Sequence, residues 1–182
     1  AHKWIDISEN GYGISVLNDC KYGCDIHNGE IGLTMLKSAV YPNPDADKEH
    51  HSFTWSIAPH EGGWREGNTV AKAYVLNNPY QTAVKENEGG NLPVSYSFVQ
   101  ADKENVVIEA VKKAEDSDAV IVRLYECYNR RGQTTLTFPR PVKRAVICNM
   151  LEEEMEEVLC CEVNKVPVQL KPYEIVTIKI EF

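Results

Sequence analysis

The sequence predicts an all-β protein made of antiparallel β-sandwiches, with one or two short helices. Short segments with period-two alternation or strong β content recur along the 182 residues, which is the pattern of half-buried strands. Turn signals separate these segments at short intervals, among them Asn10-Gly11, Asn28-Gly29 and Arg131-Gly132. Many short strands joined by turns at this spacing indicate an antiparallel sandwich.

Strands are expected at residues 4–7, 12–17, 31–36, 52–57, 94–99, 106–111, 119–125, 134–138, 143–148, 166–170 and 175–180. One helix is expected over residues 68–77, because Val70, Ala73 and Tyr74 fall on one helical face and Asn68 is suited to cap it. The acidic run over residues 151–159 is interpreted as a solvated hairpin or short helix rather than a metal site.

A polar segment, residues 81–91, divides the chain. It has no apolar periodicity and ends in Glu88-Gly89-Gly90-Asn91, a composition typical of a linker. We therefore expect a first domain over residues 1–90 and a compact β-sandwich over residues 91–182. The chain begins at Ala1 in strand-like sequence without an initiator Met, so we expect a piece of a longer protein that ends at a natural C-terminus.

Composition excludes several classes of function. The net charge of -8 opposes a nucleic-acid surface, which needs concentrated Lys and Arg. No apolar run approaches the roughly 20 residues that cross a membrane. No C-x-x-C pair occurs, which disfavours a zinc knuckle or a thioredoxin motif. The chain is too large to depend on disulfides and has no N-x-S/T sequon, so we expect reduced, mostly buried thiols rather than a disulfide framework, and a cytoplasmic protein. The six cysteines are Cys20, Cys24, Cys127, Cys148, Cys160 and Cys161.

Two turn-like segments carry the candidate chemistry, Asn18 to Gly23 and His60 to Arg65. His60-Glu61 resembles the start of H-E-x-x-H, but Trp64 stands where the second histidine belongs, which excludes a zinc protease site. Acid-base catalysis by His60 and Glu61 lacks support, because adjacent strand residues point apart. A glycosidase needs two carboxyl groups flanking one bond, and spacing locates no such pair.

Sugar recognition is the reading that these residue types support. Trp64 or Tyr22 offers an apolar stacking face, while other side chains of the two segments bond hydroxyls. The hydroxyl-bonding candidates are Asp19, Lys21, Glu61 and Arg65. Composition alone favours a plainer alternative, in which Trp64 is core, Arg65 pairs with a local carboxylate and the glycines only turn the chain. Arg123 lies inside an apolar strand, and an outward side chain is the default there.

The amino-acid sequences of three segments resemble the C-terminal part of α-mannosidases of glycoside hydrolase family 38. These are Val16 to Gly23, Tyr41 to Asp47 and Ala58 to Arg65, in matching order and spacing. Later segments look like the same family's closing β-sandwich: Val122 to Glu126, Cys148 to Glu153 and Leu170 to Ile175. The resemblance covers nearly the whole chain. Gly63 and Cys24 depart from it, since the family often has an acidic and an aromatic residue there.

The resemblance implies a parent enzyme whose N-terminal catalytic domain holds zinc through His and Asp and uses an Asp nucleophile with retention of configuration. No catalytic residue, metal ligand or cofactor is then expected in this chain. Its first portion would be part of a mutarotase-like supersandwich, followed by a small C-terminal sandwich. The implied partners are the catalytic domain of the same polypeptide and an α-mannoside met in mannose catabolism. Eight residues are candidates for the rim of the sugar site: Asp19, Lys21, Tyr22, His60, Glu61, Trp64, Arg65 and Arg123.

Alone, the chain is expected to be inactive and to associate with itself, because a truncated sandwich exposes a strand edge and apolar residues. Two other functions stay open at this stage. One is a stand-alone carbohydrate-binding or interaction sandwich without catalysis. The other is a sugar-epimerising enzyme of mutarotase-like architecture that uses His60 and Glu61.

Overall fold

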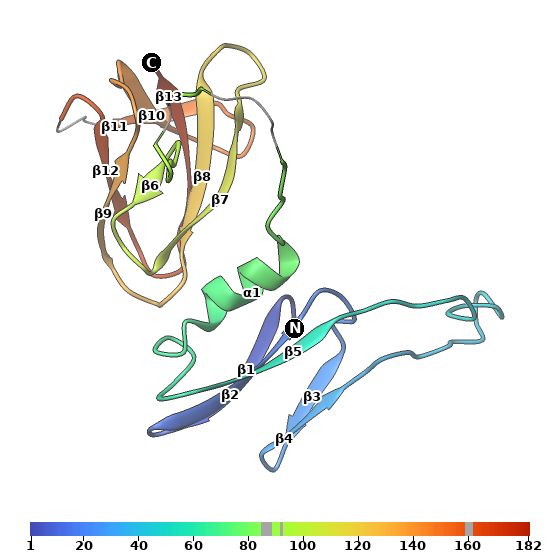
Figure 1. Cartoon of the computed structure of the whole chain (residues 1–182). Coiled ribbons are helices and arrows are strands. Elements are labelled where there is room, and N and C mark those ends of the chain that lie inside the picture. Colours follow the sequence, from blue (N-terminus) through green and yellow to red (C-terminus); the bar gives the residue numbers. More distant parts are fainter. Residues whose placement is uncertain (85–88, 92, 159–161) are drawn as a thin grey trace. The chain divides into compact units, whose positions relative to one another are not determined.

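The computed structural model describes residues 1–84, 89–91, 93–158 and 162–182. It forms two compact units, Ala1–Glu86, called unit 1, and Asn87–Phe182, called unit 2 (Figure 1). The predicted boundary between residues 90 and 91 stays a prediction, because residues 85–88 and 92, inside and beside the predicted linker, lie outside the described part.

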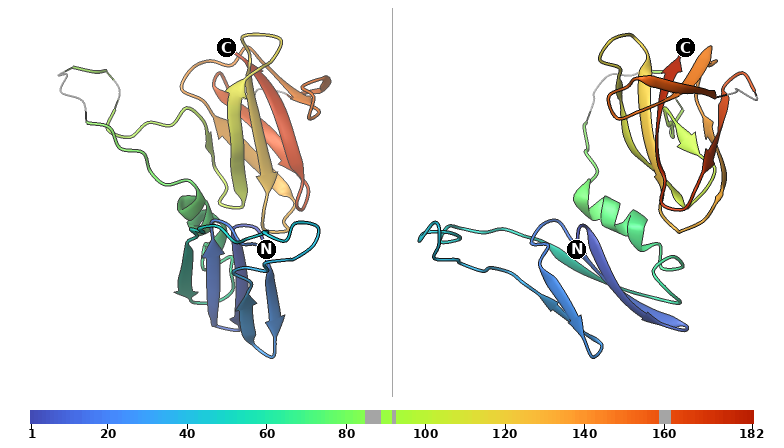
Figure 2. Two further views of the ribbon diagram at one scale, coloured as in Figure 1. Left: turned by 90° about the vertical axis from the view of Figure 1, so that its right-hand side faces the viewer. Right: turned by 180° about the vertical axis from the view of Figure 1, so that it is seen from behind.

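Unit 1 is built on a three-stranded antiparallel sheet in the order β1-β2-β5. Its strands are β1 (Trp4–Glu9), β2 (Tyr12–Asn18) and β5 (Trp55–His60). Helix α1 (Thr69–Asn77) packs on β2 and β1. A separate hairpin of β3 (Cys24–His27) and β4 (Glu30–Leu33) follows β2. From β4, residues 34–54 run out and back as a long arm without helix or strand (Figures 1 and 2).

The pairing register divides the side chains of this sheet between two faces. Asp6 and Ser15 are cross-strand partners, and Ser15 contacts Thr69 of α1, so this row lies on the face that the helix covers. Ile5 pairs with Val16, which pairs with Ile57, so this apolar row lies on the opposite face. The helix therefore covers a polar face, and the side chain of Ile57 on the other face is 70% exposed.

Unit 2 is a sandwich of a five-stranded and a three-stranded antiparallel sheet (Figure 2). The first has the order β11-β10-β13-β8-β7, with strands β7 (Val106–Lys113), β8 (Val120–Glu126), β10 (Arg144–Cys148), β11 (Glu154–Val158) and β13 (Ile175–Glu181). The second has the order β12-β9-β6, with β6 (Gln100–Ala101), β9 (Gly132–Thr137) and β12 (Lys165–Leu170). The core lies between the sheets and includes Leu124, Leu136, Phe138, Val166, Ile178 and Ile180.

The predicted all-β class and the helix are confirmed, but some elements differ. Residues 94–99 form no strand, and only Gln100–Ala101 joins β9, although Phe98 and Val99 pack against the core. Strand β3 was missed because it has only four residues, Cys24 to His27, and all four are exposed. Residues 154–158 of the acidic run form β11, which pairs with β10; residue 159 lies outside the described part.

The cysteines differ in part from the expectation. All four that the structure describes are free thiols, and Cys127 and Cys148 are buried. Cys24, however, is exposed, because its strand has no cover on either face, and Cys20 is half-buried. Cys160 and Cys161 lie outside the described residues. Over the described residues, no helix is long and apolar enough to span a membrane.

Candidate functional site

The two motif segments leave the sheet of unit 1 at opposite ends. Asn18 pairs with Trp55 and Gly13 pairs with His60. The exit of β2 and the exit of β5 are thus five residue steps apart along β2, which is about 17 Å in an extended strand. The sequence suggested one shared rim, whereas the structure separates the two starting points by the length of the sheet.

His60 belongs to a buried polar network rather than to an exposed loop. Its side chain is 3% exposed, and its Nε2 lies 2.7 Å from Oδ2 of Asp6, whose side chain is 6% exposed. The same carboxylate oxygen accepts a hydrogen bond of 2.6 Å from the Ser15 hydroxyl. Because Ser15 has one hydroxyl proton, Thr69 donates in the 2.5 Å contact between their oxygens. This network fixes the start of α1 to β1 and β2.

The charge state of Asp6 sets the tautomer of His60. Burial tends to raise the pKa of Asp6, but hydrogen bonds from Ser15, Ser8 and His60 outweigh it, and the pKa lies below its ordinary value. An ionised carboxylate only accepts, so Nε2 of His60 carries the proton. Nδ1 of His60 is buried without a hydrogen-bond partner among the described residues.

Two glycines press on the His60 ring. A Cβ atom on Gly67 would lie 2.5 Å from Cγ of His60, and a Cβ on Gly13 would clash with the same ring. With glycine on both sides and the ring buried, no ligand atom has a path to Nδ1. The His60–Asp6 pair therefore acts as a structural latch, and the arrangement does not support proton transfer to a bound sugar.

The rest of the second motif packs on unit 1 as well. The ring of Trp64 lies 5.1 Å from that of Trp4, and the guanidinium of Arg65 lies 4.1 Å above the Trp64 ring. This cation-π contact occupies one face of Trp64. Glu61 is exposed. The main role of this segment is therefore to connect β5 to α1.

The first motif keeps polar groups at the surface. Asp19 accepts a 2.9 Å bond from the backbone N–H of Thr54 and a thiol bond from Cys20, which hold its pKa below the ordinary value. Lys21 Nζ donates to Nδ1 of His51 at 3.0 Å, which ties the motif to the arm. Tyr22 is 45% exposed and its ring lies 4.0 Å from that of His2. These groups surround the exit of β2.

Arg123 lies on β8 of unit 2. It is half-buried, and its Nε donates to Oγ1 of Thr177 at 3.1 Å on β13. Val122 and Leu124, its neighbours in the strand, belong to the core between the sheets. Arg123 therefore points to the outer face of the sheet, as the sequence predicts by default.

A second buried carboxylate, Glu126, was not singled out from the sequence. It is 1% exposed and accepts from Asn105 Nδ2 at 2.8 Å, Tyr128 N at 2.8 Å and Tyr173 N at 3.0 Å. Burial tends to raise its pKa, but these donors and the Arg130 backbone lower it. Glu126 had a sequence signal, because it is in phase with the core residues Val122 and Leu124, whereas Asp6 alternates with Ile5 and Ile7 like a solvent-facing residue.

The part of the chain that the structure describes contains no group of three His, Cys, Asp or Glu side chains that could hold a metal. The described residues therefore do not fit a zinc ion. The described residues form a sheet and helix joined by the His60–Asp6 latch in unit 1, a polar and aromatic surface at the exit of β2, and a packed sandwich in unit 2.

Two family models match the sequence. The C-terminal domain of glycosyl hydrolases family 38 matches residues 1–45, and the C-terminal beta sandwich domain of the same family matches residues 105–178. Alpha-mannosidase G of Dictyostelium discoideum is 35% identical over 184 residues, and alpha-mannosidase 2C1 of Homo sapiens is 30% identical over 182. Each match covers 98% of this chain but 17% of the relative, so the chain spans about a sixth of their length.

Solved structures have the same fold. A family 38 glycosyl hydrolase from Enterococcus faecalis aligns with a TM-score of 0.78 at 18% identity, over 99% of this chain and 22% of its own. An alpha-mannosidase from Enterococcus faecalis V583 also gives a TM-score of 0.78, at 19% identity, over 99% of this chain and 21% of its own.

Proposed function

The chain belongs to the C-terminal region of glycosyl hydrolase family 38, and we propose on this basis that it is the C-terminal β part of an α-mannosidase that hydrolyses α-mannosides in mannose catabolism. The observation that carries the proposal is the match of 98% of the chain to proteins named alpha-mannosidase, of which it spans 17%. The two family 38 C-terminal models on the same chain support it.

In this proposal the reacting groups belong to an N-terminal catalytic domain of the same polypeptide. That domain would hold the zinc ion, which supplies a Lewis acid when bound, and the nucleophile of a retaining mechanism. The described residues of this chain contain no group of three His, Cys, Asp or Glu side chains that could hold a metal. The role left to the chain is to pack against the catalytic domain and to shape its rim, and alone it should be inactive.

The uncovered face of the sheet in unit 1 is the proposed packing surface. Ile7, Ile14 and Pro59 form one row of cross-strand partners there, next to the row that ends in Ile57. Ile57, on the edge strand β5, is 70% exposed, and an exposed aliphatic side chain of this size beside an apolar row suits a packing surface. We assign this face to the preceding part of the same polypeptide, which would complete the truncated sandwich.

The two motif segments receive different roles. Tyr22, Lys21 and Asp19 keep surface exposure at the exit of β2, so this loop is the one proposed to reach the sugar. His60 is buried in the latch, and Trp64 and Arg65 pack on each other. Glu61 and Arg65 stay candidates for the rim only at the opposite end of the sheet. Arg123 is assigned to the outer sheet face of unit 2.

Compartment and assembly complete the proposal. The four described cysteines are free thiols, which fits the cytoplasm. We also propose that the full enzyme associates with itself. The contact would use apolar residues of unit 1 that stay exposed after the catalytic domain has docked.

The test uses the full-length enzyme and an aryl α-mannoside. Tyr22→Ala should lower kcat/KM about tenfold, the worth of one sugar-stacking contact. The matched control is Tyr80→Ala: Tyr80 is 85% exposed beyond the end of α1 and outside both motif segments, and its loss should change kcat/KM less than about twofold. Equal effects of the two substitutions would remove the rim assignment. Absence of α-mannosidase activity in the full-length protein, or full activity of the 182 residues alone, would overturn the parent function.

A further inference from the structure

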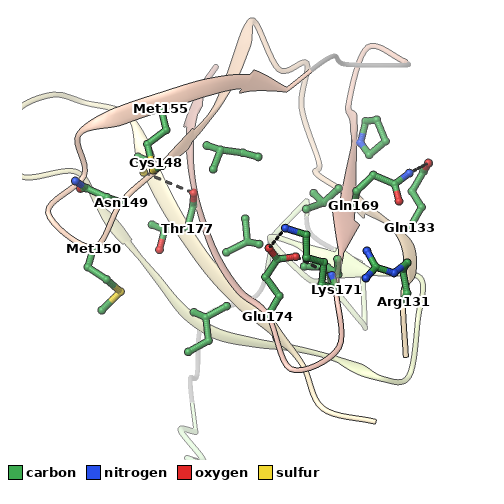
Figure 3. Close-up of a pocket in the computed structure, with 16 residues that line it drawn as sticks. Arg131, Gln133, Cys148, Asn149, Met150, Met155, Gln169, Lys171, Glu174 and Thr177 are labelled. Carbon is green, nitrogen blue, oxygen red and sulfur yellow. Dashed lines mark hydrogen bonds and ion pairs between the residues drawn. The ribbon is translucent and has the colours of Figure 1, made fainter. Parts of the chain in front are cut away.

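Unit 2 has an open groove of about 1150 Å³ between β10 and β13 of one sheet and β12 of the other (Figure 3). Its floor is aliphatic and includes Val168, Leu170 and Val176, which are buried core residues. The groove therefore opens directly onto the core of the sandwich. The apolar lining residues that stay in contact with water are Met150, Met155 and Ile175, and such exposure is costly unless something covers it.

Two methionines form one wall of the groove. Met150 is 64% exposed and Met155 is 71% exposed. Both belong to the hairpin of β10 and β11, on the side of the groove opposite Gln133 and Gln169 (Figure 3). Unbranched, polarisable methionine side chains adapt to the shape of a bound apolar partner and are frequent at peptide-binding surfaces. Their exposure beside an aliphatic floor points to binding rather than to core packing.

The lining excludes a sugar as the occupant. None of the lining residues is Trp, Tyr or Phe, so the groove has no aromatic face on which a sugar ring can stack. The volume of the groove, about 1150 Å³, also exceeds the roughly 300–1,000 Å³ of a typical small-molecule site. Its shape and chemistry suit an extended peptide segment.

Charge defines the segment further. Lys171 lies 3.7 Å from Glu174, so those two charges largely satisfy each other. Arg131 also lines the groove, and no carboxylate of the described residues lies within ion-pair distance of it. In a chain of net charge -8, this unpaired guanidinium is a local positive spot that complements a carboxylate.

We propose that this groove binds an extended, mainly apolar segment that carries a carboxylate opposite Arg131, and that the segment comes from the part of the same polypeptide outside these 182 residues. The chain spans 17% of the relatives it matches, so most of such a polypeptide lies elsewhere. A tethered segment also meets the groove at a far higher effective concentration than a free protein does. The inference rests on the proposed function only in requiring a longer polypeptide.

The test is a methionine-oxidation footprint of the full-length protein. Peroxide oxidises exposed methionine to the sulfoxide, and mass spectrometry of peptides measures each site. Met150 and Met155 should oxidise at least about tenfold more slowly in the native protein than in the same protein unfolded in urea. Their exposure within the chain itself, 64% and 71%, is too high to give that protection without an occupant.

Two charge-reversal variants supply the matched comparison. Arg131→Glu should raise the oxidation rate of both methionines about threefold or more. Arg130→Glu should leave the rates unchanged, because Arg130 does not line the groove and faces Glu104 at 3.9 Å. Native rates near the unfolded rates, or equal effects of the two variants, would overturn the proposal. Protection that disappears on dilution to the monomer would also overturn it, in favour of a second copy.

Activity measured on the same samples separates this inference from the proposed function. Unprotected methionines in a protein that hydrolyses an aryl α-mannoside would refute the groove assignment and leave the enzyme function intact. Protected methionines in a full-length protein without that activity would refute the function and support the groove.

Discussion

Asp6 in unit 1 and Glu126 in unit 2 are both buried carboxylates, and the two units stabilise them in different ways. In unit 1, Asp6 is held by side chains: the hydroxyls of Ser15 and Ser8 and the imidazole of His60. In unit 2, Glu126 is held mainly by backbone amides, those of Tyr128 and Tyr173, together with the side-chain amide of Asn105. In both, burial tends to raise the pKa, and hydrogen bonds more than compensate.

This difference in hydrogen-bond donors indicates the structural role of each carboxylate. Glu126 ties together three connections that are distant in sequence, those that contain Asn105, Tyr128 and Tyr173, and the donors are fixed by the backbone. Tyr173 takes a left-handed φ of 57° to present its N–H, an uncommon conformation for an aromatic residue. Asp6 instead joins β1, β2, β5 and the start of α1 through groups that can rotate. Glu126 therefore pins one end of unit 2 through donors that the backbone fixes. The latch of unit 1 depends on side chains that can rotate.

Glu126→Gln should give the largest effect. The amide keeps the shape but turns an N–H group toward backbone donors, which leaves buried donors unpaired at a cost of about 3 kcal/mol. The control is Glu104→Gln, whose carboxylate is 77% exposed in a 3.9 Å pair with Arg130 and contributes at most about 0.5 kcal/mol. Urea unfolding followed by far-UV circular dichroism measures both.

Tryptophan fluorescence sharpens the assignment to a unit. The three tryptophans, Trp4, Trp55 and Trp64, all lie in unit 1. The Glu126→Gln change should thus lower the urea midpoint seen by circular dichroism and leave the fluorescence midpoint in place. An equal shift of both signals would mean that the units unfold as one, and a shift of neither would contradict the pinning role.

Asp6→Asn should destabilise unit 1 by about 2 kcal/mol. The loss is smaller than for Glu126, because the hydroxyls of Ser15 and Ser8 can rotate toward the remaining carbonyl oxygen. The fluorescence midpoint in urea reports it. Asp25→Asn is the control, since Asp25 is exposed on β3 and should change the midpoint little. Equal responses to the two substitutions would show that the network around His60 contributes nothing to the fold.

The sequence predicts the sandwich of unit 2 well because its strands bury one face. β8, β12 and β13 alternate in phase with the core, and their bounds were found to within a residue or two. The strand β3 escaped because it buries nothing. Its partner β4, which is half-buried, was expected at residues 31–36, so a short exposed strand is the harder one to recognise.

The site was harder to predict because its latch is formed by residues far apart in the sequence. Asp6, Ser15, His60 and Thr69 meet on a sheet face that alternates like a solvent face, and only the helix across it makes that face interior. The sequence could suggest neither the partner of His60 nor its burial. Glu126 is a different case, because its phase with Val122 and Leu124 indicates an inward carboxylate. A buried charge at that position requires partners.

Gly67→Ala should test the latch from the other side of the His60 ring. The added Cβ would lie 2.5 Å from Cγ of His60, so the ring must shift away from Asp6, at a cost of about 1.5 kcal/mol. Gly63→Ala is the control in the same unit, because a Cβ there meets only Oε2 of the Glu66 side chain, at 3.3 Å. The fluorescence midpoint should fall for the first variant only. An unchanged midpoint would mean that the ring can move freely and that the latch is loose.

Mild acid should give the smallest effect and distinguishes the two carboxylates. Both folded pKa values are lowered, so each carboxylate contributes stability that is fully present above the unfolded pKa of about 4 and is lost as the pH falls through the folded value. Between pH 7 and pH 5 neither group should contribute a change, and at pH 4 each should cost only about 0.5 kcal/mol. Asp6→Asn should remove this acid sensitivity from the fluorescence midpoint, and Glu126→Gln should remove it from the circular dichroism midpoint. If both midpoints kept the wild-type pH dependence in the variants, other groups would control acid unfolding. The charges of Asp6 and Glu126 would then not account for the acid sensitivity of their units.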